Sequence, residues 1–182
     1  DACLAISHDI AGRMKERKSI IRKDSILEAV SRIAEHFLRV TPWEEHVNQA
    51  LEILGKASDV SRCYIFVNHR GEKGEELCSC RYEWCSKSIH PQIHNMDLQN
   101  VDYQSGGINR WHTLLSKREI LTDHIRNLSG QEKEALESQG IISICVVPIF
   151  VWGSFWGFIG FDECRELREW NIEEQKSLRI VS

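Results

Sequence analysis

Three cysteines and two histidines form the densest set of candidate metal ligands in the chain. They are Cys78, Cys80, Cys85, His90 and His94. Zinc prefers thiolate sulfur and imidazole nitrogen, so a metal site or a thiol-based redox sensor is one hypothesis. The spacing is not that of a CxxC knuckle, and strand alternation puts Cys85 opposite Cys78 and Cys80 unless a bulge intervenes. The alternative is that the cysteines are small buried strand residues and the histidines are solvated loop residues.

The sequence contains no recognisable catalytic motif. No nucleophile is paired with a base, no glycine-rich loop predicts phosphate binding, and no helical histidine pair predicts a metalloprotease. We therefore predict that this segment is not an enzyme. The seven cysteines are an odd number, and several lie in apolar runs, which is typical of reduced thiols in a cytoplasmic protein.

The composition is that of an ordinary globular protein. The 182 residues are 42% hydrophobic and 27% charged, with a formal charge of −4. No basic patch predicts nucleic-acid binding. The apolar run at the start is too short for a signal peptide, so we expect a cytoplasmic domain.

An uncharged stretch near the C-terminus must lie at the centre of the fold. It runs from Ile141 to Phe161 and is long enough to cross a bilayer. Pro148 and several glycines interrupt it, so we predict two antiparallel strands, Ser143–Val151 and Phe155–Asp162, with no membrane contact. Both strands are apolar at nearly every position, which indicates that other elements cover both of their faces.

The N-terminal part combines a short apolar run with a long helical pattern. Asp1–Ile10 is typical of the end of a strand whose partners lie elsewhere. Apolar residues at helical spacing then predict one helix over Met14–Val40, a connector or dimer seam. Two helices broken near Lys23-Asp24 are the alternative. Thr41 is the expected N-cap of the next helix.

The remaining predicted elements are short. Arg62–Val67 and Leu77–Ser86 have the composition of a strand hairpin, and the polar stretch Lys87–Gly107 predicts a long loop with one helical turn. The other predictions are a helix at Ile108–Leu115, a strand at Glu119–Thr122, a helix after Ser129 with Glu132 in a capping box, and a last helix after Asn171 with Glu174 in a capping box.

This order of elements and several segments resemble GAF domains, which are sensory α/β modules. The segments are Ser61–His69, Arg81–Cys85, Ile89–Asn100, Ile108–Leu121 and, most specifically, Gln139–Cys164. The resemblance covers the chain from about Ser25 to its end. It implies an α+β fold (an α/β sandwich) with a central antiparallel sheet of five or six strands. Terminal helices would cover one face, and loops and short helices would cap a ligand pocket on the other.

A second resemblance lies at the start of the chain. Ala5–Lys18 is similar to the junction after a PAS domain, where a last strand ends in Asp-Ile and a basic helix follows. It implies that residues 1–13 end an upstream PAS-like domain, that 14–40 form a connector or dimer helix, and that 41–182 form a GAF domain ending in an outgoing helix.

The known chemistries of GAF domains find little support in these residues. Phe158, Asp162 and Glu163 match only the second half of the Asn-Lys…Phe-x3-Asp-Glu signature of cyclic-nucleotide GAF domains. The cap has no cysteine for methionine sulfoxide reduction, and without a Cys-His pair a covalent bilin is not expected. A haem ligand would have to be His112 or His124, each of which is more typical of a packing or surface residue.

The resemblance also implies a ligand pocket between the sheet and its cap. The predicted lining is Tyr64, Phe66, Trp84, Trp111, His112 and Val147. Aromatic residues of this kind could equally form a filled core.

The predicted function is sensory. The domain would bind an unidentified small molecule or partner and transmit a signal through its terminal helices to an output domain such as a histidine kinase. A homodimer through Met14–Val40 and Asn171–Ser182 is expected. The alternatives are a ligand-free GAF domain that only dimerises, and the metal or thiol redox sensor.

Overall fold

The fold is an antiparallel sheet with helices on both faces. The computed structural model describes residues 2–37 and 42–180. The six strands follow the spatial order β3-β2-β1-β6-β5-β4, and neighbours are antiparallel. They are β1 (Arg62–Arg70), β2 (Glu76–Cys85), β3 (Val101–Asp102), β4 (Leu121–His124), β5 (Ser143–Val151) and β6 (Ser154–Glu163).

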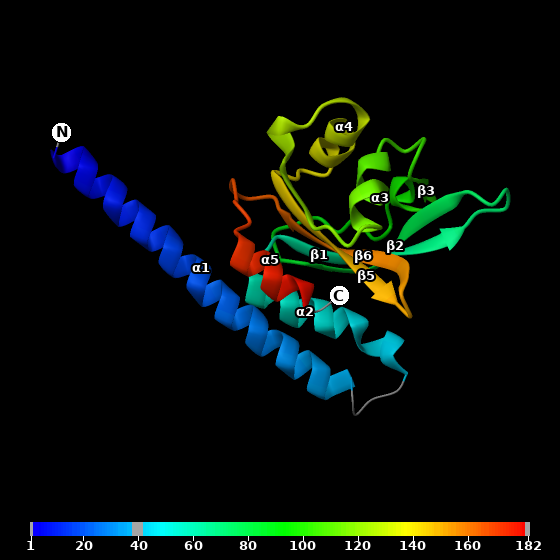
Figure 1. The fold of residues 1–182 in the computed structure, drawn as a ribbon, viewed down its shortest axis with the longest axis horizontal. Coiled ribbons are helices and arrows are strands. Elements are labelled where there is room, and N and C mark those ends of the chain that lie inside the picture. Colours follow the sequence, from blue (N-terminus) through cyan, green and yellow to red (C-terminus); the bar gives the residue numbers. More distant parts are fainter. Residues whose placement is uncertain (1, 38–41, 181–182) are drawn as a thin grey trace.

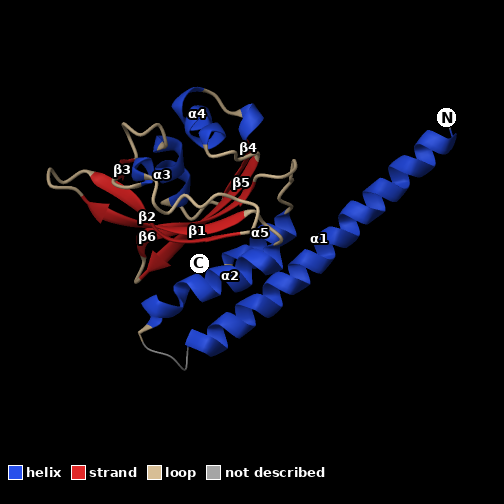
Figure 2. Cartoon of the chain, turned by 180° about the vertical axis from the view of Figure 1, so that it is seen from behind, coloured by secondary structure: helices blue, strands red, loops and turns tan. Residues whose placement is uncertain are grey.

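The helices divide between the two faces of this sheet. The first face is covered by α1 (Ala2–Phe37), α2 (Val47–Ser58) and α5 (Ile172–Arg179), and the second by α3 (Asn109–Leu115), α4 (Gly130–Ser138) and loops (Figures 1 and 2). Short 3-10 turns are η1 (Trp43–His46), η2 (Met96–Leu98) and η3 (Ile125–Asn127). The predicted α+β sandwich with an antiparallel sheet is confirmed, and the sheet, predicted to have five or six strands, has six.

The central hairpin β5–β6 is buried on both sides, as its uniform apolar composition predicted. Ile144 and Val146 contact the core on the capped face, whereas Cys145 and Val147 contact the core under α1, α2 and α5. Successive side chains point to opposite faces of the sheet because the pleat of a strand has a period of two residues. No described helix is long and apolar enough to span a membrane.

The first hairpin contains a bulge that changes which side chains face which core. Phe66 pairs with Cys80 and Ile65 pairs with Tyr82, so Arg81 is one extra residue in β2. Beyond this point Tyr82 and Trp84 point to the helices. Trp84 lies directly over Gly55 of α2, where an added Cβ would be 2.2 Å from the indole ring.

The N-terminal segment differs from its prediction. Ala2–Phe37 is one helix, so the strand predicted over Asp1–Ile10 is wrong, as is the break near Lys23-Asp24. A short apolar run without a neighbouring strand has no backbone partners except those of its own helix. Its first part extends beyond the sheet in both views, whereas Ile26 and Ala29 are buried farther along the helix (Figures 1 and 2). The predicted helix end at Val40 and the N-cap at Thr41 lie outside the described residues.

The short elements were predicted with mixed success. The strand expected at Glu119–Thr122 is β4, shifted two residues along the chain, and β3 was not predicted. Asn171 and Glu174 form the predicted capping box of α5. Ser129 precedes α4 but makes no side-chain cap, and the carboxylate of Glu132 is bonded to Arg110 and Trp111, so the predicted capping box is absent.

Candidate ligand pocket

A cavity of about 110 Å³ lies between the sheet and the cap on the second face. Its walls are mostly apolar and come from β1, β2, β6, the 86–108 segment that contains η2 and β3, α3 and α4. Among them are Tyr64, Phe66, Leu98, Val101, Ile108, Trp111, Leu136, Ile141 and Phe158. The rings of Phe66 and Phe158 stack with centroids 5.0 Å apart, and Trp111 meets Phe158 edge-on. Apolar walls with a few polar groups are typical of small-molecule sites.

One end of the cavity is formed by a buried arginine. Arg62 is 1% exposed, and its Nε lies 3.3 Å from Oδ2 of Asp162. Its Nη2 donates to the carbonyl of Gln139 at 3.1 Å, and Nη1 lies 3.9 Å from Glu83. A guanidinium keeps its charge even when it is buried, so carboxylates must compensate it.

Glu83 also holds the loop that covers the cavity. Its carboxylate accepts hydrogen bonds from the backbone N–H groups of Gln92 and Ile93 at 2.8–3.0 Å. The bulge at Arg81 directs Glu83 to this face, opposite Tyr64 of β1. The loop is therefore fixed to the same charged group that faces Arg62.

Asp162 is held between Arg62 and Tyr64. The Tyr64 hydroxyl donates to Oδ1 of Asp162 at 3.0 Å. Burial raises the pKa of the Asp162 carboxyl to about 7, against the opposing effect of Arg62. The next residue, Glu163, accepts from Ser61 and Arg165. Both acidic residues of the partial Phe-x3-Asp-Glu pattern thus make contacts within the chain.

A second polar cluster at the cavity wall joins α3 and α4 of the cap to the edge strand β4. The Trp111 indole donates to Glu132 at 2.8 Å, and Arg110 forms ion pairs with Glu132 and Asp123 at 2.6 and 2.7 Å. These contacts tie α3 to α4 and β4. They also explain why Glu132 does not cap its own helix.

The structure brings three of the six predicted lining residues to the cavity. Tyr64, Phe66 and Trp111 line it. Val147 does not, because the alternation of β5 places it in the core under the helices, and Trp84 lies there because of the bulge.

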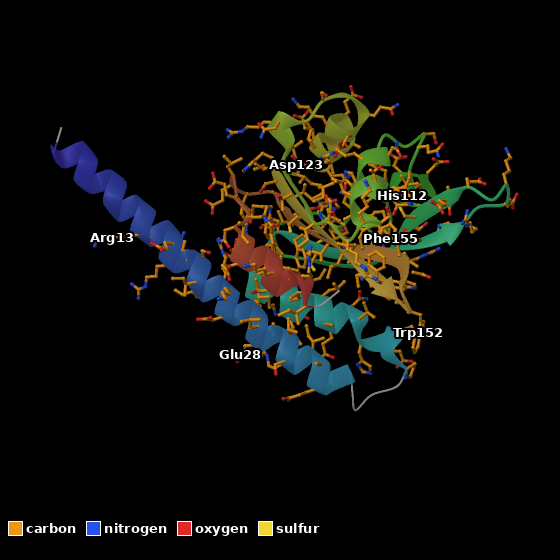
Figure 3. The ribbon with its side chains drawn as sticks, in the orientation of Figure 1. Arg13, Glu28, His112, Asp123, Trp152 and Phe155 are labelled. Carbon is orange, nitrogen blue, oxygen red and sulfur yellow. The ribbon has the colours of Figure 1, made fainter. Side chains whose placement is uncertain are left out.

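His112 also lies outside the cavity, in a second depression near the rim of the sheet. It is 3.0 Å from Glu76 and its ring is 4.9 Å from that of Tyr103. Figure 3 shows it close to Phe155 on β6, and the two ring centroids are 6.0 Å apart.

The sequence prediction missed lining residues of both kinds. Six apolar ones were not predicted, which are Leu98, Val101, Ile108, Leu136, Ile141 and Phe158, and neither were the charged residues Arg62, Glu83 and Glu132. The sequence contained one signal for Arg62. It directly precedes the apolar run from Cys63 to Val67, and a charged residue at such a position is either exposed or paired with an opposite charge. No sequence signal identified the partners.

The candidate metal ligands do not converge. Cys78 and Cys80 are buried in the core of the capped face, and the bulge does turn Cys85 towards that face. However, no three His, Cys, Asp or Glu side chains in the described part of the chain could hold a metal ion together. Burial raises the pKa of Cys78, Cys80 and Cys85 to about 12, so these thiols stay protonated near neutral pH.

Comparison with known proteins places this fold in a family. The GAF domain family matches residues 42–182. The chain belongs to the GAF domain family. The methanogenesis regulatory histidine kinase FilI of Methanothrix harundinacea is 32% identical over 177 residues, which are 97% of this chain and 20% of the kinase. This GAF domain chain therefore spans about a fifth of the length of that curated relative.

Solved GAF domains share the fold at low sequence identity. The phycocyanobilin-bound GAF domain of a cyanobacterial phytochrome superposes with a TM-score of 0.67 at 15% identity, covering 87% of this chain and 88% of that one. The chromophore-binding domain of Stigmatella aurantiaca bacteriophytochrome gives 0.65 at 12% identity, covering 86% and 57%. These similarities show a common architecture, and the pigments belong to those proteins.

Proposed function

We propose that this GAF domain is the sensory unit of a longer cytoplasmic signalling protein. A small molecule in the capped cavity would change the packing of α1 and α5, and these helices would pass the change to an output domain such as a histidine kinase. The observation that carries the proposal is the arrangement of the cavity and the two helices on opposite faces of one sheet. The relative with a histidine kinase name supports this type of output.

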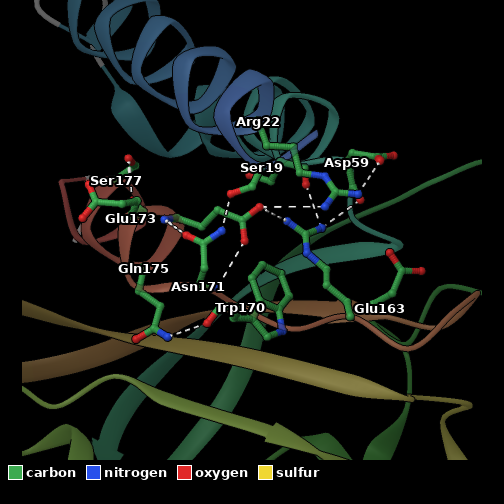
Figure 4. Close-up of polar contacts among 12 residues, drawn as sticks. Ser19, Arg22, Asp59, Glu163, Trp170, Asn171, Glu173, Gln175 and Ser177 are labelled. Atoms are coloured by element: carbon green, nitrogen blue, oxygen red, sulfur yellow. Dashed lines mark hydrogen bonds and ion pairs between the residues drawn. The ribbon is translucent and has the colours of Figure 1, made fainter. Parts of the chain in front are cut away.

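The two helices are joined at the start of α5. Asn171 donates to the Ser19 hydroxyl (Figure 4). Arg22 lies 3.9 Å from Glu174, and Lys23 lies 3.6 Å from Glu173. The same two residues, Asn171 and Glu174, form the capping box of α5. A change in the position of α5 would therefore alter its contacts with α1.

A short chain of contacts connects the cavity wall to this junction. Asp162 pairs with Arg62 at the cavity, and its neighbour Glu163 is bonded to Arg165 at 2.8 Å. Arg165 donates to the backbone carbonyl of Asp59, and the side chain of Asp59 pairs with Arg22 of α1 at 3.2 Å. Packed strands and charged networks of this kind can couple two sites when they have two arrangements.

Apolar residues exposed on the terminal helices favour a homodimer as the signalling form. Met14, Ile20 and Ile21 on α1, and Ile172 near the start of α5, are each more than half exposed. A second copy of the chain would cover them, as in a helical dimer seam. The second candidate function is a domain that only dimerises. The same exposed residues would form its dimer contact, and no ligand would be needed.

The assignment of residues 1–13 to an upstream PAS domain stays a prediction. The strand on which it was based is not present, because residues 2–13 belong to α1.

The proposal is tested by locking the junction. Ser19→Cys and Asn171→Cys together allow a disulfide between α1 and α5, in a fusion of this chain to a histidine kinase module. Output should become insensitive to added ligand when the bond is oxidised and recover when it is reduced. Unchanged signalling in the oxidised protein would contradict transmission through this junction. Native mass spectrometry of the purified chain then separates the two candidate functions, because only a ligand-binding domain loses bound mass on denaturation.

A further inference from the structure

Arg62 lines the cavity, and its buried guanidinium has donors without an acceptor. Its Nη2 is bonded to Gln139, whereas Nη1 and Nε have no hydrogen-bond partner among the described residues, and Nε lies beside Asp162. The distance of 3.9 Å from Nη1 to Glu83 is an ion pair and too long for a hydrogen bond. A buried charged donor without an acceptor is costly, so this atom is the natural anchor for a polar group of a ligand.

We propose that the cavity takes an uncharged molecule about the size of one aromatic ring, with a carbonyl oxygen that accepts a hydrogen bond from Nη1 of Arg62. This inference rests on the proposed sensory function and names the class of its ligand. Three properties of the cavity point to this class of ligand: its size, its apolar walls and the balance of charge around Arg62.

Size limits the ligand to about one ring. The cavity encloses about 110 Å³, somewhat less than an engineered apolar cavity of about 150 Å³ that binds benzene. Its aromatic walls include the stacked rings of Phe66 and Phe158, and the edge of Trp111 meets Phe158. Flat apolar surfaces of this kind suit offset or edge-on contact with another ring.

Charge selects a neutral acceptor over an anion. Arg62 already faces two buried carboxylates, Asp162 at 3.3 Å and Glu83 at 3.9 Å. A carboxylate ligand would bring a third negative charge to one guanidinium in a poorly hydrated site. Burial, opposed by Arg62, raises the pKa of Asp162 to about 7, so negative charge is already disfavoured there. A carbonyl oxygen satisfies Nη1 without adding charge.

Titration of the full chain with three ring-sized probes tests the class. Benzamide carries a neutral amide carbonyl, benzoate carries an anionic carboxylate, and toluene has no hydrogen-bond acceptor. Calorimetry at pH 8 measures the affinity of each probe. We expect benzamide to bind about tenfold or more tightly than toluene, the usual strength of a hydrogen bond to a charged group. Benzoate should bind more weakly than benzamide. Equal affinities for benzamide and toluene, or a preference for benzoate, would overturn the proposal.

Two comparisons test whether the probes bind in this cavity and contact Nη1 of Arg62: wild type with Arg62→Lys, and Leu98→Phe with Met96→Phe. Arg62→Lys keeps the charge but replaces the planar guanidinium with a single ammonium, which has no second nitrogen at the place of Nη1, so benzamide affinity should fall to near that of toluene while toluene binding stays unchanged. Leu98→Phe fills the cavity from its covering loop and should abolish binding of both probes. Met96→Phe is the matched control, because Met96 is on the same turn but 78% exposed. Binding to Leu98→Phe as to the wild type would place the probes elsewhere and overturn the proposal.

The outcome also separates this inference from the proposed function. If toluene and benzamide bind equally and Leu98→Phe excludes both, the ligand class is wrong but the cavity remains a ligand site. If no probe binds, and native mass spectrometry finds no bound mass in either the wild type or Leu98→Phe, both the class and the ligand-sensing function fail.

Discussion

Asp162 on β6 faces Arg62 on the neighbouring strand β1, with 3.3 Å between Oδ2 and Nε and almost no exposure of either side chain. The pair lies where the cavity meets the network that leads to α1. Removing either partner would leave an uncompensated charge buried in the protein and lower its free energy of unfolding. The same two residues therefore contribute both to the proposed ligand site and to the stability of the domain.

The first prediction concerns the effect of pH on this pair. Burial raises the pKa of Asp162 to about 7, and the groups that act on it are the charged Arg62, Glu83 and Glu163 and the neutral hydroxyl of Tyr64. Between about pH 4 and pH 7 the folded protein then holds a proton that the unfolded chain has lost. The contribution to the free energy of unfolding is therefore complete below about pH 4 and is lost as pH rises through 7.

Asp162→Asn removes this proton and keeps an oxygen for the Tyr64 hydroxyl. Urea denaturation at pH 5, 6, 7 and 8 should show the wild type losing more stability than the variant as pH rises. The difference over this range should be on the order of 1–3 kcal/mol. Parallel pH profiles for the two proteins would show that Asp162 is ionised throughout the range.

The second prediction concerns the loop over the cavity. Glu83→Gln removes the charge that the N–H groups of Gln92 and Ile93 bond to, and leaves one acceptor oxygen. We expect a loss of about 1–2 kcal/mol, because charge-assisted bonds become neutral ones. Hydrogen exchange should quicken at the amides of Gln92 and Ile93. Glu72→Gln, on the exposed turn between β1 and β2, is the control and should change neither measurement.

The third prediction tests the contact between α2 and the bulged strand. Gly55 lies inside α2, where alanine would ordinarily stabilise a helix by roughly 1 kcal/mol. Here the new Cβ would lie 2.2 Å from the Trp84 ring, so Gly55→Ala should destabilise the domain by about 1–3 kcal/mol. In a Trp84→Leu background the same change should become neutral or stabilising. A double-mutant cycle by chemical denaturation measures this coupling, and additive effects would contradict it.

The sequence predicted the elements with a dense local signal. Ser143–Val151 is bounded as predicted because every residue from Ser143 to Val151 lacks charge and a turn follows. Asn171 and Glu174 gave α5 its start, since the capping box is a contact within one helical turn. Two residues of the pocket wall, Tyr64 and Phe66, were predicted as well, because they alternate on β1 and the extra residue of the bulge lies in β2.

The sequence could not predict features that depend on pairing between distant segments. The bulge at Arg81 is visible only in the register of β1 with β2, and it moved Trp84 away from the pocket and Glu83 into it. Glu132 was predicted to cap its own helix, but Arg110 and Trp111 offer it stronger partners from α3. A strand of two residues such as β3 has no periodicity to detect.

The last prediction separates the two roles of Asn171 at the helix junction. Its Oδ1 accepts from the backbone N–H of Glu174, and its Nδ2 donates to Ser19 of α1. Asn171→Ala removes both contacts and should lower the free energy of unfolding by about 1–2 kcal/mol, mostly through the lost cap. Ser19→Ala removes only the contact between helices and should cost less than about 1 kcal/mol. Hydrogen exchange decides what the contact does: if it holds α1 to α5, both variants quicken exchange in α1 around residues 16–24, and only Asn171→Ala quickens it at the first turn of α5. Unchanged exchange in α1 for Ser19→Ala would show that the salt bridges of Arg22 and Lys23 hold the helices together without it.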